Sequence, residues 1–409
     1  MKKIIFSNIV FSILIIVFGL VGSILISRTL GPSQRGEIAA IILWPTLLLY
    51  LGSFGTYQAV IYHFSKKNRN IENIWGTCIV ITLLNSIVSI LVGSTLIFLT
   101  LKLLSIELKW YSFYLLLFIP LGIASQFISS VLQAKTLFKE YNFTRLFTPL
   151  FYLIGIISLF LLDKLSVMNI ISLQITLIVL QFFVFLSLYN KRIGSVFNFK
   201  YHKKTIKIIY NYGYKVWLGD LSQGLNVKMD QILISGMLLS KDLGIYVVAT
   251  SIANFTSVIP NAYKTVFLPL ISSTKKMVEK INITKKVLFN FLWINLGVTM
   301  VCFIATPIAI PLLFGEEFRE SVFISYILLV GFLFLNFKIV LASIMQGFGK
   351  PLFVSYSEIA GLIALLIIVY PLTNNYGLIG ASSAISVAYL VQFLTLYTLF
   401  IRIKNQYND

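Results

Sequence analysis

Six ionisable side chains interrupt long apolar runs of the sequence, and all six lie in its second half. An ionised group in the middle of a bilayer costs about 2.5 to 3.5 kcal/mol, and such groups normally face a bundle interior or a water-filled cavity. Placed separately in lipid, six would cost about 15 to 21 kcal/mol, more than a typical total stability of about 5 to 15 kcal/mol. The sequence therefore predicts that these groups are hydrated or paired. They are Asp220, Lys228, Asp230, Lys264, Lys338 and Glu358.

Three of these residues are lysines and three are carboxylates, which allows two interpretations. Ammonium groups are point-charge partners for phosphate, so the three lysines are candidate ligands for an anionic substrate. The three carboxylates could then pair with these lysines or bind a coupling cation. The alternative interpretation is that the six residues form internal ion pairs that serve only helix packing. Lys228 and Asp230 are two residues apart, about 200° around a helix, so they cannot both face one partner.

The segments that carry these residues have the length of membrane-spanning helices. Of the 409 residues, 58% are hydrophobic and only 11% are charged, with a mean hydropathy of +0.91, whereas soluble domains carry about 25% charged residues. Because one crossing needs about 20 apolar residues, we predict an all-α polytopic membrane protein with about twelve spans. The spans are predicted near residues 4–27, 37–63, 73–101, 110–132, 142–162, 167–189, 209–239, 244–271, 286–313, 319–345, 351–372 and 377–401.

The positions of Lys and Arg test this count independently, because short cytoplasmic loops retain positive charge. With both termini inside, 23 of the 33 basic residues fall in inner segments, 7 in outer segments and 3 within spans. Missing one span would exchange the inner and outer loops that follow it and remove this asymmetry. The charge pattern therefore favours an even number of spans near twelve.

Two pairs of similar segments indicate an internal repeat. "RTLGPSQRGEIAA" at 28–40 resembles "LLSKDLGIYVVAT" at 238–250 with an offset of 208, and "VLQAKTLFKEY" at 131–141 resembles "IMQGFGKPLF" at 344–353 with an offset of 213. Six spans per repeat give both halves the same orientation, so the repeat is parallel and substrate is expected between the lobes. We predict an N-terminal lobe at 1–195, a basic interfacial linker at 196–215 and a C-terminal lobe at 209–409.

Several function classes fit this sequence poorly. The net charge of +19 is spread over many short inner loops, so anionic lipid is a better counter-charge than nucleic acid. The two cysteines, Cys78 and Cys302, lie in apolar runs, and the only histidines are His63 and His202. These residues suggest no metal site and no cofactor. The longest outer segment has about ten residues, which leaves no room for the catalytic loop of a membrane-embedded glycan polymerase, so we do not expect an enzyme.

The turn after the first span and its counterparts carry a family resemblance. "SRTLGPSQRGEIAA" resembles the R-x-LG-P-x-x-x-G-x-x-A signature of polysaccharide flippases of the Wzx type, members of the superfamily that includes MATE drug exporters and the lipid II flippase. "QAKTLFKEYNFTR" and "VKMDQILISGMLLSKDLGIYVVA" support the match. The resemblance implies a MATE-like fold. The motif residues are Arg28, Gly31, Pro32, Gly36 and Gly244, and for the turn itself a structural corner is the simpler role.

The resemblance also implies a function. Such a flippase moves oligosaccharide repeat units linked to undecaprenyl pyrophosphate from the cytoplasmic to the outer leaflet of the bacterial plasma (inner) membrane by alternating access. The pyrophosphate is a suitable ligand for the three lysines, and a glycan polymerase is a candidate partner. The alternatives are a cation-coupled multidrug exporter of the MATE type and a glycan polymerase. The sequence does not distinguish O-antigen from capsule, and sodium, protons, membrane potential or downstream polymerisation could each supply the energy.

Overall fold

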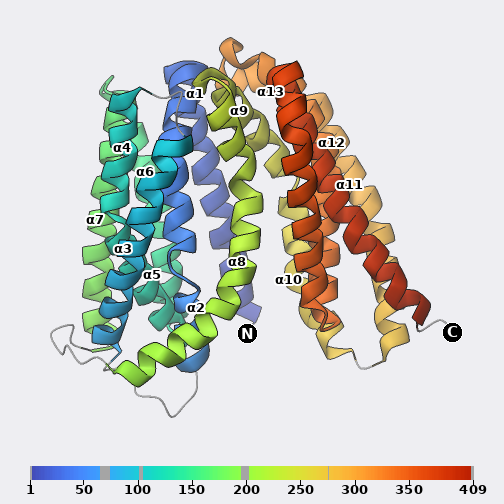
Figure 1. Cartoon of the computed structure of the whole chain (residues 1–409), viewed down its shortest axis with the longest axis horizontal. Coiled ribbons are helices and arrows are strands. Elements are labelled where there is room, and N and C mark those ends of the chain that lie inside the picture. The colour runs from blue at the N-terminus through green and yellow to red at the C-terminus, as the bar shows by residue number, and fades with distance from the viewer. Residues whose placement is uncertain (1, 65–73, 101–104, 195–201, 275, 407–409) are drawn as a thin grey trace. The chain divides into compact units, whose positions relative to one another are not determined.

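The computed structural model of the chain describes residues 2–64, 74–100, 105–194, 202–274 and 276–406. Every element within these ranges is a helix (Figure 1). The first seven are α1 (Lys2–Leu51), α2 (Thr56–Phe64), α3 (Trp75–Thr100), α4 (Ile106–Leu117), α5 (Ile119–Ala134), α6 (Phe138–Leu161) and α7 (Val167–Arg192). The others are α8 (Lys203–Met237), α9 (Ser240–Phe255), α10 (Val258–Ser273), α11 (Met277–Phe314), the 3-10 helix η1 (Glu316–Phe318), α12 (Glu320–Gly347) and α13 (Pro351–Gln406).

The helix lengths agree with about twelve membrane crossings. Eight helices of the described residues are long and apolar enough to span a bilayer, and the bent pair α9–α10 makes a ninth candidate. α1 and α13 have 50 and 56 residues, about 75 and 84 Å of helix, and each turns sharply at a glycine with a positive φ angle, Gly31 or Gly377. α13 therefore contains two spans, whereas α1 contains the first span and the first part of the second, which α2 completes. α8 supplies a further helix of 35 residues. Since every described element is a helix and most are long enough to cross a bilayer, the predicted all-α polytopic fold is confirmed.

The chain forms two compact units. Unit 1 contains residues 1–30 and 37–228, and unit 2 contains residues 31–36 and 229–409. In unit 1, α5 is the central helix and packs against α2, α3, α6 and α7. Its inner face is lined with small and branched apolar residues, so neighbouring helices approach it closely.

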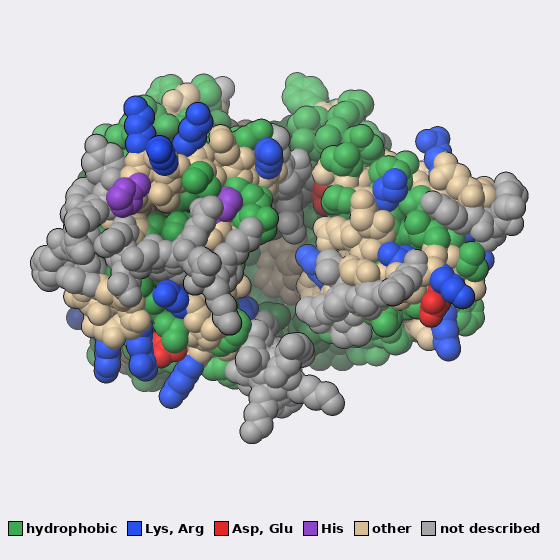
Figure 2. Space-filling view, turned by 90° about the horizontal axis from the view of Figure 1, so that it is seen from below, with side chains coloured by type: hydrophobic (Ala, Val, Ile, Leu, Met, Phe, Trp, Pro, Cys, Tyr) green, Lys and Arg blue, Asp and Glu red, His purple; other side chains and the backbone are tan. Residues whose placement is uncertain are grey.

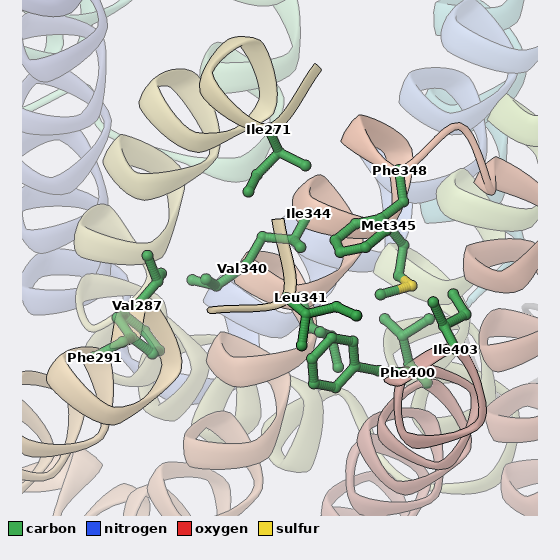
Figure 3. Close-up of a cluster of buried hydrophobic side chains, with 12 residues drawn as sticks. Ile271, Val287, Phe291, Val340, Leu341, Ile344, Met345, Phe348, Phe400 and Ile403 are labelled. Atoms are coloured by element: carbon green, nitrogen blue, oxygen red, sulfur yellow. The ribbon is translucent and has the colours of Figure 1, made fainter. Parts of the chain in front are cut away.

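In unit 2, α12 takes the central position and packs against α9, α10, α11 and α13. Its core is a cluster of buried apolar side chains, which Figure 3 shows converging from α10, α11, α12 and α13. In the predicted repeat, α5 is the fourth span of the first half and α12 the fourth span of the second. The members of this cluster are Ile271, Val287, Phe291, Val340, Leu341, Ile344, Met345, Phe348, Leu396, Phe400 and Ile403, together with Ile281.

The basic segment before the seventh span is helical from Lys203. This segment was expected to be an interfacial element that leads into the span at residue 209, and both belong to the single helix α8. Residues 196–201 of the predicted linker lie outside the described residues. One face of this first part of α8 packs on the other helices of unit 1 through the fully buried Ile209 and through a stacked ring pair, Tyr62 and Tyr212, with centroids 4.4 Å apart. Its exposed face carries lysines, which fits an amphipathic interfacial helix.

Basic side chains are spread over one end of the helices. Figure 2 views this end and shows many Lys and Arg side chains with few acidic ones. Lys135, Lys139, Lys203 and Lys207, all from segments predicted to face inward, are exposed. The distribution is the one expected of helix ends that retain positive charge.

Candidate functional site

Two of the six ionisable residues form a buried ion pair within unit 2. The Lys338 ammonium on α12 donates a hydrogen bond to the Glu358 carboxylate on α13, and each side chain is only 9% exposed. Taking two charges out of water is expensive, and only close pairing with further hydrogen bonds offsets the cost. The pairing satisfies the expectation that charges within the spans are not left isolated.

Asp230 on α8 forms a second buried polar contact in the same unit. The Tyr246 hydroxyl on α9 donates to Asp230 Oδ2 at 2.5 Å, and the backbone N–H of Gln231 donates to Asp230 Oδ1 at 2.7 Å. Asp230 is 6% exposed and Tyr246 is fully buried. The carboxylate therefore has a specific hydrogen-bond partner on each of its oxygens.

Tyr389 on α13 lies near both of these contacts, close to the Asp230 and Glu358 carboxylates. Its ring packs edge-on against Phe332 with the centroids 5.6 Å apart. We refer to Asp230, Tyr246, Lys338, Glu358 and Tyr389 as the buried polar cluster. It contains two carboxylates and one ammonium group, an arrangement that could accept a further positive charge, whether a proton or a cation.

The other predicted residues lie elsewhere. Lys264 is exposed on α10, two helical turns after the break that separates α10 from α9. Lys228 is half-buried on α8 and is the last residue of unit 1. Asp220 also lies on α8, but its side chain is outside the described part of the chain. The structure thus brings together Lys338, Glu358 and Asp230, and it does not show the three lysines as one group.

The residues of the family motif form a tight turn rather than a ligand site. Residues 31–36 pack as part of unit 2. A Cβ atom on Gly36 would lie 1.7 Å from the Ser240 carbonyl oxygen, and one on Gly244 would lie 1.9 Å from the Pro32 carbonyl oxygen. Only glycine allows two backbones to approach so closely. Pro32 and Ser240 are 208 positions apart, as are Gly36 and Gly244, so the contact follows the predicted repeat.

Two other residues of the motif, Gly31 and Arg28, lie where the first span ends. Gly31 has a φ angle of 69°, in the left-handed region that favours glycine, and its Cα faces the Glu317 side chain of η1. Arg28 is exposed near the end of the first span. The structural corner expected of this segment is therefore what its geometry supports.

Sequence reasoning did not find the two tyrosines of the buried polar cluster. Tyr246 and Tyr389 are two of 21 tyrosines in an aromatic-rich sequence. No spacing distinguishes them, because the carboxylates near them are distant in the sequence. The buried amides Asn295 and Asn336 were also not selected, although an amide inside a span is itself a signal of interhelical hydrogen bonding. Among the described residues, no group of three or more His, Cys, Asp or Glu side chains is placed to hold a metal ion.

Comparison with known proteins identifies the family. The model of the "polysaccharide biosynthesis protein" family matches residues 25–323, well over half of the chain. The chain belongs to this family. It is 26% identical over 208 residues to a proposed O-antigen transporter of Shigella flexneri, covering 50% of each chain. It is also 26% identical over 182 residues to the capsular polysaccharide biosynthesis protein CapF of Staphylococcus aureus, covering 44% of this chain and 46% of CapF. The chain thus spans about half the length of the curated relatives that it matches.

Solved structures share the fold of this family member at low sequence identity. The lipid II flippase MurJ in an inward closed conformation aligns with 98% of this chain and 90% of its own, with a TM-score of 0.69 and 16% identity. An inward-facing MATE multidrug transporter aligns with 95% of this chain and 94% of its own, with a TM-score of 0.74 and 13% identity. The predicted MATE-like fold is therefore confirmed.

Proposed function

We propose that this family member is a flippase that moves oligosaccharide repeat units linked to undecaprenyl pyrophosphate from the cytoplasmic to the outer leaflet. One observation carries the proposal: a chain of the polysaccharide biosynthesis family has the fold of transporters. Nearly all of its length is used for membrane crossings, so transport of an assembled glycan fits the chain better than its synthesis does. The aligned O-antigen and capsule relatives support a glycan cargo.

The lysines within the spans would recognise the pyrophosphate. An ammonium group is a point-charge partner for phosphate, and a low local dielectric strengthens such contacts. Lys264 is exposed and could contact a headgroup directly. Lys338 is held by Glu358, so a phosphate would have to replace that carboxylate. Lys228 on α8 is the third candidate ligand.

The carboxylates would couple this exchange to an energy source. Asp230 and Glu358 lie in the buried polar cluster with a single lysine, so a proton or a sodium ion could occupy the cluster while a phosphate holds Lys338. Asp220 is the third carboxylate that we propose as a charge partner or as a ligand of the coupling cation. Membrane potential and downstream polymerisation are the other sources of energy that fit a flippase of this kind.

The proposed setting is the inner membrane of a bacterium, with both termini in the cytoplasm. The exposed lysines at the helix ends of Figure 2 support this orientation because positive charge is retained on the cytoplasmic side. A glycan polymerase acting on the outer leaflet is the proposed functional partner, since it would consume the flipped repeat units.

Deletion of the gene in its own host, followed by analysis of lipid-linked glycan, tests the proposal. We expect lipid-linked repeat units to accumulate where an added membrane-impermeant glycosidase cannot reach them in intact spheroplasts. Complementation with the wild-type chain should restore polymer and remove the accumulated units. Single repeat units accessible from outside would instead assign the chain to polymerisation. Unchanged glycan with increased drug sensitivity would assign it to multidrug export.

A further inference from the structure

The second span of each repeat is broken near its middle. In unit 1 the break lies between α1 and α2 at residues 52–55, where Phe54 and Gly55 have φ angles of 49° and 64°. In unit 2 the break lies between α9 and α10 at Thr256 and Ser257, where the helix axis bends by 48°. Pro260 explains the second break, because its ring would clash with the carbonyl four residues earlier. Breaks at corresponding places in both halves of a transporter indicate a functional segment.

Side-chain amides brace the break in unit 2. Asn336 of α12 is fully buried and accepts a hydrogen bond from the Ser257 hydroxyl at 2.9 Å. Its amide nitrogen donates to the Thr256 hydroxyl at 3.0 Å and to Asn295 Oδ1 of α11 at 3.1 Å. Asn295 in turn donates to the Leu333 carbonyl of α12 at 3.1 Å. One amide therefore fixes both residues of the break to two neighbouring helices.

The break in unit 1 is braced in a similar way. Asn85 of α3 donates to the Ser53 carbonyl at 3.1 Å, and Gln126 of α5 donates to the Leu49 carbonyl at 3.3 Å. The Trp217 indole of α8 donates to the Leu51 carbonyl at 2.8 Å. The Leu51 and Ser53 carbonyls also accept backbone N–H bonds from Phe54 and Thr56, so side chains and tight-turn backbone bonds together satisfy the carbonyls at the break, as buried backbone groups in a membrane require.

The bracing amides correspond to one another in the two halves. Asn85 and Asn295 are 210 positions apart, and so are Gln126 and Asn336. Both offsets lie between those of the motifs that define the repeat, 208 and 213. The third and fourth spans of each half therefore carry an amide at corresponding positions. In the first half both amides bond to the broken second span, and in the second half Asn336 bonds to it while Asn295 holds Asn336.

We propose that Asn336 is a positioning residue that fixes the bend between α9 and α10 and thereby places Lys264. Lys264 follows Ser257 by seven residues, about 10 Å along α10. If the 48° bend relaxed by half, Lys264 would move by about 4 Å, and Leu270, about 20 Å from the break, by about 8 Å. A shift of 4 Å is enough to remove a charge-assisted hydrogen bond to a phosphate oxygen.

The bend can be measured without any transport assay. The two free cysteines, Cys78 and Cys302, are first replaced by alanine. Spin labels are then placed at Leu270 on α10 and Met300 on α11, which are exposed and belong to the same unit. The distance between the two labels is measured by pulsed electron–electron double resonance for the full chain in lipid nanodiscs, with and without Asn336→Leu.

Asn336→Leu keeps the number and branching of the side-chain heavy atoms but removes the three hydrogen bonds to the break and to α11. We expect the distance between the labels at Leu270 and Met300 to shift or broaden by several ångströms. A second label pair, at Met300 and Leu366 of α13, should be unchanged, which shows that unit 2 is still folded. Ser343→Ala is the matched control, since it removes a buried hydrogen bond within α12 to the Val340 carbonyl.

An unchanged distance between α10 and α11 in Asn336→Leu would overturn the bracing role. The claim that Asn336 positions Lys264 rests on the proposed function of Lys264. A binding measurement tests this claim separately from the bend. Asn336→Leu and Lys264→Ala should both weaken binding of farnesyl pyrophosphate, and the double variant should be no weaker than Lys264→Ala alone. Additive losses would show that the bend does not act through Lys264. The deletion assay tests the flippase proposal separately, so either proposal can fail alone.

Discussion

Replacing Lys338 by methionine should destabilise unit 2 strongly. The double variant, in which Lys338→Met is combined with Glu358→Gln, should keep nearly the stability of the wild type. Both side chains of this pair are 9% exposed. Removing one partner of a buried pair leaves an uncompensated charge and costs about 3 to 5 kcal/mol. We expect a loss of this size for Lys338→Met and for Glu358→Gln. Replacing a buried pair by uncharged residues of similar volume is often neutral, so the double variant should lie within about 1 kcal/mol of the wild type.

The measurement is unfolding of the purified chain in mixed micelles by increasing SDS, followed by loss of helical circular dichroism. Lys286→Met is the control, because Lys286 is exposed on α11. The coupling energy between Lys338 and Glu358 follows from the double-mutant cycle. A double variant as unstable as the single variants would refute the reasoning, since the cost would then come from packing rather than from an unpaired charge.

Transport by the same variants separates the two interpretations of the lysine. If Lys338 binds the pyrophosphate, the double variant should fold and insert normally but fail to restore glycan in the deletion strain. If Lys338 and Glu358 serve only packing, the double variant should restore glycan as well as stability. The stability measurement and the glycan assay together decide between these interpretations.

Two further predictions concern residues outside this pair. Lys264→Ala should insert normally but reduce glycan transport at least tenfold, about 1.4 kcal/mol for one lost charge-assisted contact, whereas Lys286→Ala should transport at the wild-type level in the complementation assay. Gly36→Ala should cost about 1 to 3 kcal/mol in SDS unfolding, because its Cβ would lie 1.7 Å from a backbone carbonyl oxygen. Gly297→Ala is the control, because nothing lies within 4 Å of its added Cβ atom. It should stabilise the folded chain by at most about 1 kcal/mol.

The span count could be predicted because it depends on one-dimensional quantities. Apolar length and the distribution of basic residues do not require knowledge of which helices touch, so about twelve spans followed from the sequence. The turn at residues 31–36 was also predictable as a corner, since glycine and proline restrict backbone geometry locally. The expectation that charges within the spans are paired or hydrated came from their transfer cost, and the pair of Lys338 and Glu358 agrees with it.

The partners of these charges could not be predicted, because they depend on helix packing. Nothing in the sequence relates Asp230 to Tyr246, which lies on the next helix, or to Tyr389, 159 positions away. The breaks in the second spans were missed for a different reason. Hydropathy is continuous through residues 244–271, and a single Pro260 in an apolar run does not show by itself whether a helix kinks or ends. The amide that holds the bend, Asn336, comes from another helix.

α12 carries both the bracing amide and the candidate ligand, and this placement limits how the site can work. Asn336 and Lys338 are two residues apart, so their side chains point about 200° apart around the helix. One side of α12 is fixed to the break before α10, and the other is fixed to α13 through Glu358. Because the ammonium is buried, it can leave Glu358 only when another anion or water reaches it. Under the proposed function, a phosphate that enters would break the ion pair between α12 and α13 while the hydrogen bonds from Asn336 to the break before α10 stay intact. We therefore expect the Lys338 side of α12 to be the one that responds to substrate.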